Sequence, residues 1–252
     1  MSKAIYQPKG KAREYSAWAC NLYNGCPNAC YYCYNNKGIT KSKVGGTNVR
    51  LKKCLVDEKT ALSIFKEELD RYKESIIHDG FLHFNFVSDP CLPETIELNW
   101  SCIDYALSKG VLCQVLTKRA DWLEHPAVQN ALSHPKLLIG FSLTGCDDLE
   151  PGASTNDERI RAMQVLHKAG IYTWASIEPI IDPEKSLDMI AKTIECCDLY
   201  RIGILSGIKN YTPYDIRCFM SRVYMLGSIP VFWKNSLIDF IRKKSIWEMT
   251  LP

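Results

Sequence analysis

Strand-like and helix-like segments alternate along most of this 252-residue chain. Dense apolar runs predict six strands, at residues 17–22, 81–87, 111–117, 137–143, 171–177 and 199–205. Helical patterns follow at residues 59–77, 94–108, 120–133 with a break at Pro126, 155–169, 183–196 and 213–225. Such alternation gives parallel strands joined by right-handed crossovers. Six units are too few for a closed eight-stranded barrel, so we predict an α/β fold, an open six-stranded (β/α)6 partial TIM barrel.

A single domain is expected over residues 1–252, because no linker or internal repeat interrupts the alternation. Residues 1–17 should form a basic, extended N-terminal segment and residues 18–226 the partial barrel. Residues 227–252 should form a C-terminal extension, with a short apolar run at 229–233 and a helix at 236–244. Residues 35–53 are rich in Lys, Gly and Asn and predict an exposed loop.

The distribution of apolar residues also indicates where in the cell the protein is expected. No apolar run approaches the ~18 residues that a membrane span needs. No apolar signal segment opens the chain. We therefore expect a protein of the reducing cytoplasm with no membrane partner.

The most specific chemical feature follows the first predicted strand. Cys26, Cys30 and Cys33 stand at spacings of four and three. Turn residues such as Pro27 and Asn28 make this segment a loop, which can curl three sulfurs toward one point. Three thiolates on a four-iron cluster leave one iron open to a small bidentate ligand. The pattern therefore predicts that the three cysteines bind a 4Fe–4S cluster.

The cysteine loop is also compatible with structural zinc or with a disulfide framework. Structural zinc takes four tetrahedral ligands, and Cys20 could be the fourth. Zinc sites usually pair their cysteines, however, whereas this loop has a run of three. A disulfide framework is disfavoured because the expected compartment is reducing.

Charge is distributed unevenly along the chain. Residues 1–53 hold ten Lys or Arg and one acid, a formal charge of +9, so the remainder carries −6 of the net +3. This skew next to the cysteine loop suggests a polyanionic partner, DNA or RNA, bound through residues 1–53. A solvated basic segment accounts for the same charges equally well.

Polar residues follow the predicted strands repeatedly. In parallel barrels the carboxyl ends of the strands carry the chemistry. A single polar residue at such a place is usually a helix cap or a turn. Five sets in succession are harder to explain as caps: Ser88-Asp89, Thr117-Lys118-Arg119, Ser142 with Thr144, Ser176 with Glu178, and Ser206-Gly207.

Five motifs occur in the order typical of a known group of enzymes. They are Gly25-Cys-x3-Cys-Tyr-Tyr-Cys-Tyr, Ser88-Asp-Pro-x-x-Pro-x-Thr95, Leu116-Thr-Lys118, Phe141-Ser-Leu-Thr144, and Glu150-Pro-Gly-Ala-Ser154 running into Arg159. Together they resemble the spore photoproduct lyase-like branch of the radical S-adenosylmethionine (radical SAM) superfamily. The cysteine motif is specific, and the later motifs are individually weaker. The resemblance implies that SAM binds the open iron and is cleaved by an electron to methionine and a 5′-deoxyadenosyl radical.

The resemblance also assigns residues to the SAM site. Lys118 and Ser142 are expected to contact the SAM carboxylate, for which an ammonium and a hydroxyl are suitable donors. Tyr32 is expected to lie against the adenine. Glu178 would bind the ribose or the amino group, although an ion pair with a neighbouring Arg accounts for it nearly as well. The remaining residues of the expected cofactor site are Ser88, Asp89 and Thr144.

One position departs from the pattern of this branch. Spore photoproduct lyase has a hydrogen-donating Cys two residues before the Ser that corresponds to Ser88, and this chain has Phe86 there. Cys91 lies three residues after Ser88 and is the candidate catalytic substitute, although the role of a small loop residue fits it as well. Because function depends on the site, the reaction of spore photoproduct lyase does not transfer with the resemblance.

Three functions therefore remain open at the level of the sequence. The first is a radical SAM enzyme that modifies or repairs a nucleic acid and takes electrons from an external donor such as flavodoxin or ferredoxin. The second is a radical SAM enzyme that acts on a peptide or a small metabolite. The third is a zinc-bearing nucleic-acid-binding protein without catalysis.

Overall fold

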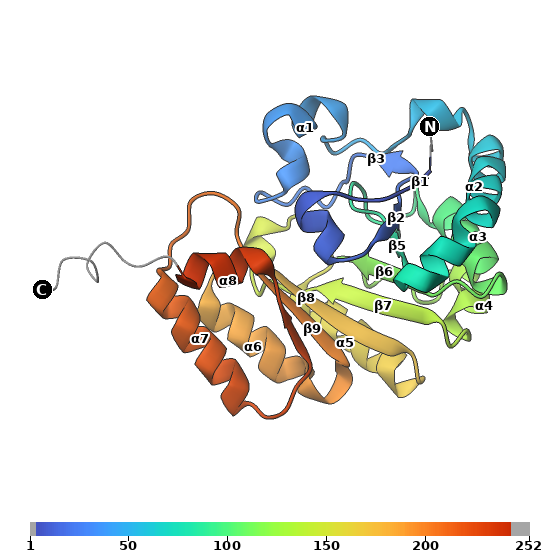
Figure 1. The fold of residues 1–252 in the computed structure, drawn as a ribbon. Helices are drawn as coiled ribbons and strands as arrows, with labels where there is room; N and C mark the ends of the chain where they lie inside the picture. The colour runs from blue at the N-terminus through green and yellow to red at the C-terminus, as the bar shows by residue number, and fades with distance from the viewer. Residues whose placement is uncertain (1–3, 243–252) are drawn as a thin grey trace, which may run out of the picture.

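A computed structural model describes residues 4–242 and places most strands in one open sheet (Figure 1). The strand order is β1-β2-β5-β6-β7-β8-β9-β10. All neighbouring pairs are parallel except β1 with β2. The bounds are β1 Ile5–Tyr6, β2 Trp18–Cys20, β5 Leu82–Phe84, β6 Cys113–Thr117, β7 Leu137–Ser142, β8 Tyr172–Ile180, β9 Leu199–Ile204 and β10 Val231–Trp233. β3 Tyr23–Asn24 and β4 Arg50–Leu51 form a separate antiparallel pair.

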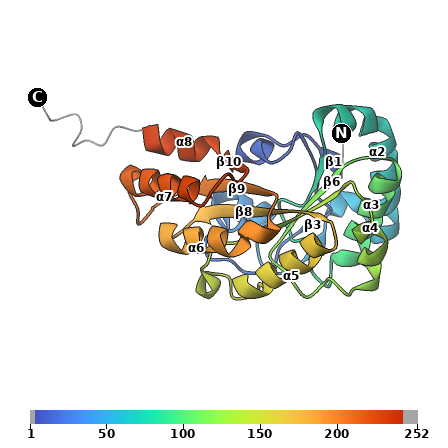
Figure 2. The same cartoon turned by 90° about the horizontal axis from the view of Figure 1, so that it is seen from below.

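Helices connect the parallel strands. They are α1 Gly38–Lys43, α2 Glu58–Asp79, α3 Ile96–Ser108, α4 Gln129–Leu132, α5 Asn156–Lys168, α6 Pro183–Thr193, α7 Pro213–Met225 and α8 Asn235–Arg242. Figure 2 shows α5 and α6 on one side of β8 and β9, with α8 and the N-terminal segment on the other. None of the helices within residues 4–242 is long and apolar enough to cross a membrane.

Local sequence explains where the helices begin and which side they bury. In α2 the predicted apolar stripe of Ala61, Phe65 and Leu69 is buried in the core. Asp57 caps this helix by accepting a hydrogen bond from the backbone of Thr60. The predicted capping box at the start of α5, Thr155 with Glu158, is present.

The predicted α/β fold with an open, mostly parallel sheet is confirmed, and all six predicted strands belong to the sheet. The sheet also contains two edge strands that were not among the six. β1 lies within the segment 1–17, which additionally contains a 3-10 helix at Gly10–Glu14. β10 comes from the apolar run at 229–233 of the C-terminal extension and pairs with β9.

Two other predictions need correction, and a third is described only in part. The segment 35–53 is mostly exposed as predicted, but it contains α1 and β4. The helix predicted at 120–133 breaks at Pro126 as expected, because Pro126 has no backbone N–H, but only a 3-10 turn at Pro126–Val128 and α4 are formed. The final helix begins at Asn235, and its predicted end at residue 244 lies outside the described residues.

Candidate active site

A cavity of about 500 Å³ opens at the carboxyl ends of the parallel strands. Its wall is built from the cysteine loop, the ends of β5 to β10 and part of the N-terminal segment. This size is usual for the binding site of a small molecule or cofactor. Of the predicted site residues, those that line it are Cys26, Cys30, Cys33, Tyr32, Ser88, Asp89, Lys118, Ser142 and Glu178.

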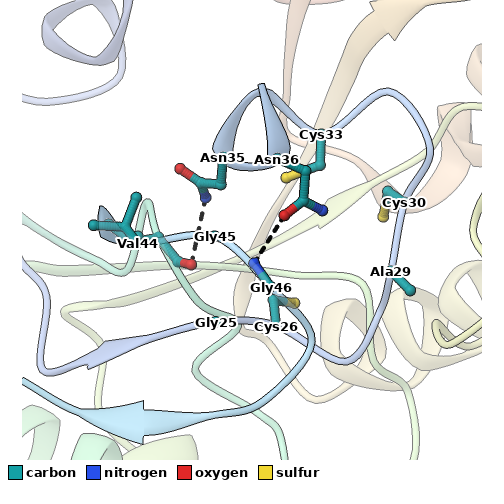
Figure 3. Close-up of a pocket in the computed structure, with 11 residues that line it drawn as sticks. Gly25, Cys26, Ala29, Cys30, Cys33, Asn35, Asn36, Val44, Gly45 and Gly46 are labelled. Carbon is teal, nitrogen blue, oxygen red and sulfur yellow. Dashed lines mark hydrogen bonds between the residues drawn. The ribbon is translucent and has the colours of Figure 1, made fainter. Parts of the chain in front are cut away.

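The three loop cysteines also surround a second, smaller hollow of about 20 Å³ (Figure 3). The backbone of Gly45 and Gly46 closes it on the side of α1, and Gly46 N donates to Asn36 Oδ1 at 2.9 Å. Cys26, Cys30 and Cys33 therefore stand between this hollow and the large cavity, since they line both.

The carboxylate of Asp89 fixes the cysteine loop to the end of β6. Its Oδ2 accepts from Asn28 Nδ2 at 2.9 Å and from Lys118 N at 2.8 Å. Its Oδ1 accepts from Thr117 Oγ1 at 2.6 Å and from Cys91 N at 3.0 Å. With both oxygens occupied, Asp89 positions its neighbours and has little capacity left for a ligand.

Ser88 ties the segment after β5 to the cysteine loop. Its Oγ donates to the carbonyl of Gly25 at 2.7 Å. The hydroxyl of Ser142 forms no hydrogen bond within residues 4–242, and Ser142 lines the cavity at the end of β7. Ser142 is therefore ready to donate to a bound molecule, whereas the Ser88 hydroxyl is already committed.

Glu150 organises the charged groups beneath the cysteine loop. Lys118 Nζ lies 2.9 Å from Glu150 Oε1. The Glu150 carboxylate also accepts hydrogen bonds from Tyr32 and Arg159. Burial alone would raise the pKa of Glu150, but Lys118 and Arg159 lower it to about 2. Burial, and then the charge of Glu150, raise the pKa of the Tyr32 hydroxyl. The Glu150 carboxylate therefore holds Tyr32 and Lys118 next to each other.

The β7–α5 loop packs directly on the cysteine loop. Gly152 N donates to the carbonyl of Asn28 at 3.2 Å, and Tyr31 N donates to the carbonyl of Leu149 at 3.0 Å. A Cβ at Gly152 would lie only 2.0 Å from the carbonyl oxygen of Pro27. Glycine is therefore required for this close approach.

The opposite side of the cavity carries a second ion pair. Lys234 Nζ lies 2.8 Å from Glu178 Oε2, and both side chains line the cavity. Tyr15 donates to the same carboxylate oxygen, and its hydroxyl lies 2.8 Å from Ser176 Oγ. Burial, and then the charge of Glu178, raise the pKa of Tyr15 well above its ordinary value. The neighbour expected for Glu178 was an Arg, and the structure supplies Lys234 from the end of β10.

Two predicted site residues lie elsewhere. Cys91 is 2% exposed and does not line the cavity, and burial raises the pKa of its thiol well above the usual value. Thr144 is fully buried and accepts a hydrogen bond from Cys146 N at 3.3 Å. The structure therefore gives no support to Cys91 as a hydrogen donor or to Thr144 as a cofactor contact.

The residues present suit an iron–sulfur cluster beside a bound cofactor. Three cysteines line one hollow. Burial raises the pKa of the Cys30 thiol, and the nearby Lys118 ammonium opposes that rise. Cys20 is buried in the core and lines neither cavity. Within the described part of the chain, no group of three His, Cys, Asp or Glu side chains converges on a single metal ion.

Sequence comparison gives little information. No known family profile matches the chain. The uncharacterised protein ORF301 of Acidianus two-tailed virus is 26% identical over 227 residues, which is 81% of this chain and 70% of that protein.

Structure comparison is more informative. Spore photoproduct lyase with bound AdoMet and dinucleoside spore photoproduct superposes with a TM-score of 0.60 at 16% identity, over 86% of this chain and 63% of that one. SuiB of Streptococcus suis bound to S-adenosylmethionine superposes with a TM-score of 0.61 at 12% identity, over 88% of this chain and 51% of SuiB. This chain thus spans less than two thirds of either protein, and at these identities the likeness concerns the fold. The chain has the partial-barrel fold of the radical SAM enzymes, as in spore photoproduct lyase and SuiB.

Proposed function

We propose that this chain is a radical SAM enzyme that binds a 4Fe–4S cluster through Cys26, Cys30 and Cys33. The observation that carries the proposal is the position of these thiols. They surround one hollow and line the large cavity at the carboxyl ends of the strands, together with most residues expected to bind SAM. A bound cluster would supply the electron that cleaves SAM to methionine and a 5′-deoxyadenosyl radical.

The protein's part is to hold SAM in place. The free hydroxyl of Ser142 can donate to the SAM carboxylate, and Lys118 can add a charge-assisted bond while it stays near Glu150. Tyr32, held by Glu150, lines the cavity, where it can pack against the adenine.

The substrate that we propose is DNA or RNA. Lys9 and Lys11 of the basic segment line the cavity itself, so part of the +9 charge of residues 1–53 lies at the site. Tyr31 and Tyr34, beside Cys30 and Cys33, are 72% and 56% exposed and can stack on bases. An external donor such as flavodoxin or ferredoxin would supply the electron.

Metal analysis of anaerobically purified protein tests the cluster. We expect iron, acid-labile sulfide and brown colour in the wild type and in the Cys20→Ala control. Cys26→Ala, Cys30→Ala and Cys33→Ala should each lose all three properties. Stoichiometric zinc in an iron-free wild-type protein would favour the zinc-bearing, non-catalytic function instead.

A further inference from the structure

Asn85, directly after β5, lines the large cavity with an unsatisfied amide. It is 5% exposed, and neither its Nδ2 nor its Oδ1 forms a hydrogen bond with any residue in the range 4–242. Because an unpaired buried amide costs free energy, nearly all buried amides have a partner. The buried amide of Asn99 is also unpaired within this range but does not line the cavity, whereas Asn85 lies on the cavity wall, where a bound molecule can supply its partner.

The backbone holds Asn85 in this position. Asn85 N donates to the carbonyl of Cys20 at 2.9 Å, and the next residue, Phe86, donates its N–H to Asn21 Oδ1 at 2.7 Å. The φ angle of Asn85 is +63°, a left-handed conformation that few residue types other than Asn and Gly adopt. The backbone thus holds the Asn85 side chain at the cavity wall before a ligand arrives.

Two exposed lysines line the same cavity from the N-terminal segment. Lys11 Nζ donates to Ser206 Oγ at 2.9 Å, which holds this segment against the end of β9. No partner of Lys9 is found within the described residues, and its ammonium group is available to an anion. The cavity therefore combines an amide that can pair with a planar polar edge and cations that can bind a phosphate.

We propose that Asn85, Lys9 and Lys11 form a nucleotide-recognition subsite, an inference that rests on the proposed radical SAM function. The Asn85 amide offers a donor beside an acceptor, which matches the edge of a nucleobase. Lys9 and Lys11 then bind the adjacent phosphate. A peptide amide could also pair with Asn85, but it would bring no anion for the two lysines.

Calorimetric titration of the anaerobic, SAM-bound holoenzyme tests this subsite. The probes are the four deoxynucleoside 5′-monophosphates, the corresponding nucleosides and an uncharged acetylated tripeptide amide. The variants are Asn85→Asp, which keeps the size, and Asn85→Gly, which fits the positive φ. The third is the pair Lys9→Gln with Lys11→Gln, and exposed Asn130→Asp is the matched control.

We expect at least one nucleotide to bind more tightly than its nucleoside. Both Asn85 variants should weaken the binding of that nucleotide and of its nucleoside by about tenfold or more. The double lysine variant should bring nucleotide affinity down to that of the nucleoside and leave nucleoside affinity unchanged. Asn130→Asp should behave as the wild type.

Three results would overturn the subsite. The first is a holoenzyme that cleaves SAM but binds no nucleotide, or prefers the tripeptide amide. The second is nucleotide affinity that both Asn85 variants retain. The third is a loss of SAM affinity in these variants in place of nucleotide affinity, which would assign Asn85 to the cofactor. Failure of the proposed function would look different, because no 5′-deoxyadenosine would form with any probe.

Discussion

Glu150 shows how single residues hold the candidate site together. Its carboxylate is buried among Lys118, Arg159 and Tyr32, and its pKa of about 2 lies below the ordinary 4.5. A carboxyl group with a lowered pKa stabilises the folded state above its unfolded pKa, and this contribution disappears as the pH falls through the folded value.

We therefore predict a pH-dependent loss of stability in Glu150→Gln. Near pH 7 the variant should be less stable by about 3–5 kcal/mol, because Arg159 is left buried without its partner. The difference should shrink below about pH 4.5 and largely vanish near pH 2, since protonation then removes the same charge from the wild type. Urea denaturation across this range measures it, with exposed Glu195→Gln as the control. A difference that stays constant with pH would contradict the assignment.

Some site residues could be predicted from their positions after the predicted strands, and others could not. Ser88, Lys118 and Ser142 could be placed because the carboxyl ends of parallel strands meet at one edge. Glu150 belonged to a recognised motif, but its role depends on an Arg and a Lys that approach only in the folded chain. Asn85 lay inside a predicted strand, and nothing local indicated that its amide would be unpaired.

At the scale of the elements, the contact between the cysteine loop and the β7–α5 loop leaves no room for a side chain at Gly152. Gly152→Ala should push the two loops apart, because the added Cβ meets the backbone of Pro27. We expect a reduced iron content after reconstitution, by about half or more, with the overall fold retained by circular dichroism. Gly170→Asn is the control, since its positive φ suits Asn and no atom lies within 4 Å of the added Cβ. Equal iron in both variants would show that the loop contact does not position the cysteines.

The elements themselves were predictable to different degrees. Long apolar runs gave all six inner strands, because strands buried on both faces are continuously apolar. Two features escaped this pattern. The strand predicted at 81–87 ends at Phe84, since Asn85 turns the chain with its positive φ. The helix α1 has six residues and none of them is buried, so no periodic pattern could reveal it.

At the scale of the whole molecule, the charge distribution makes a prediction about salt. Lys37, Lys41, Lys43 and Lys53 are all exposed on the segment that carries the cysteine loop. Replacing them with Gln should weaken binding to DNA or RNA. It should also reduce the slope of log affinity against log salt by about 0.7–0.9 for each lysine that contacts a phosphate.

Fluorescence anisotropy with labelled oligonucleotides at several salt concentrations measures this slope. The control replaces with Gln the exposed Lys59 and Lys168, which lie on the acidic remainder of the chain. The change in slope for each lysine replaced is then compared between the two variants. An equal effect per charge in the control would indicate diffuse attraction. An absence of binding by the wild type at low salt would contradict a nucleic-acid substrate.

The central claim, that this fold and these cysteines make a radical SAM enzyme, is tested most directly by one measurement. The reconstituted protein is incubated anaerobically with SAM and dithionite, and 5′-deoxyadenosine and methionine are quantified by mass spectrometry. We predict that both products form in equal amounts with the wild type and with Cys20→Ala, and that neither forms with Cys30→Ala. Wild-type protein that contains its iron and sulfide but leaves SAM intact would contradict the claim.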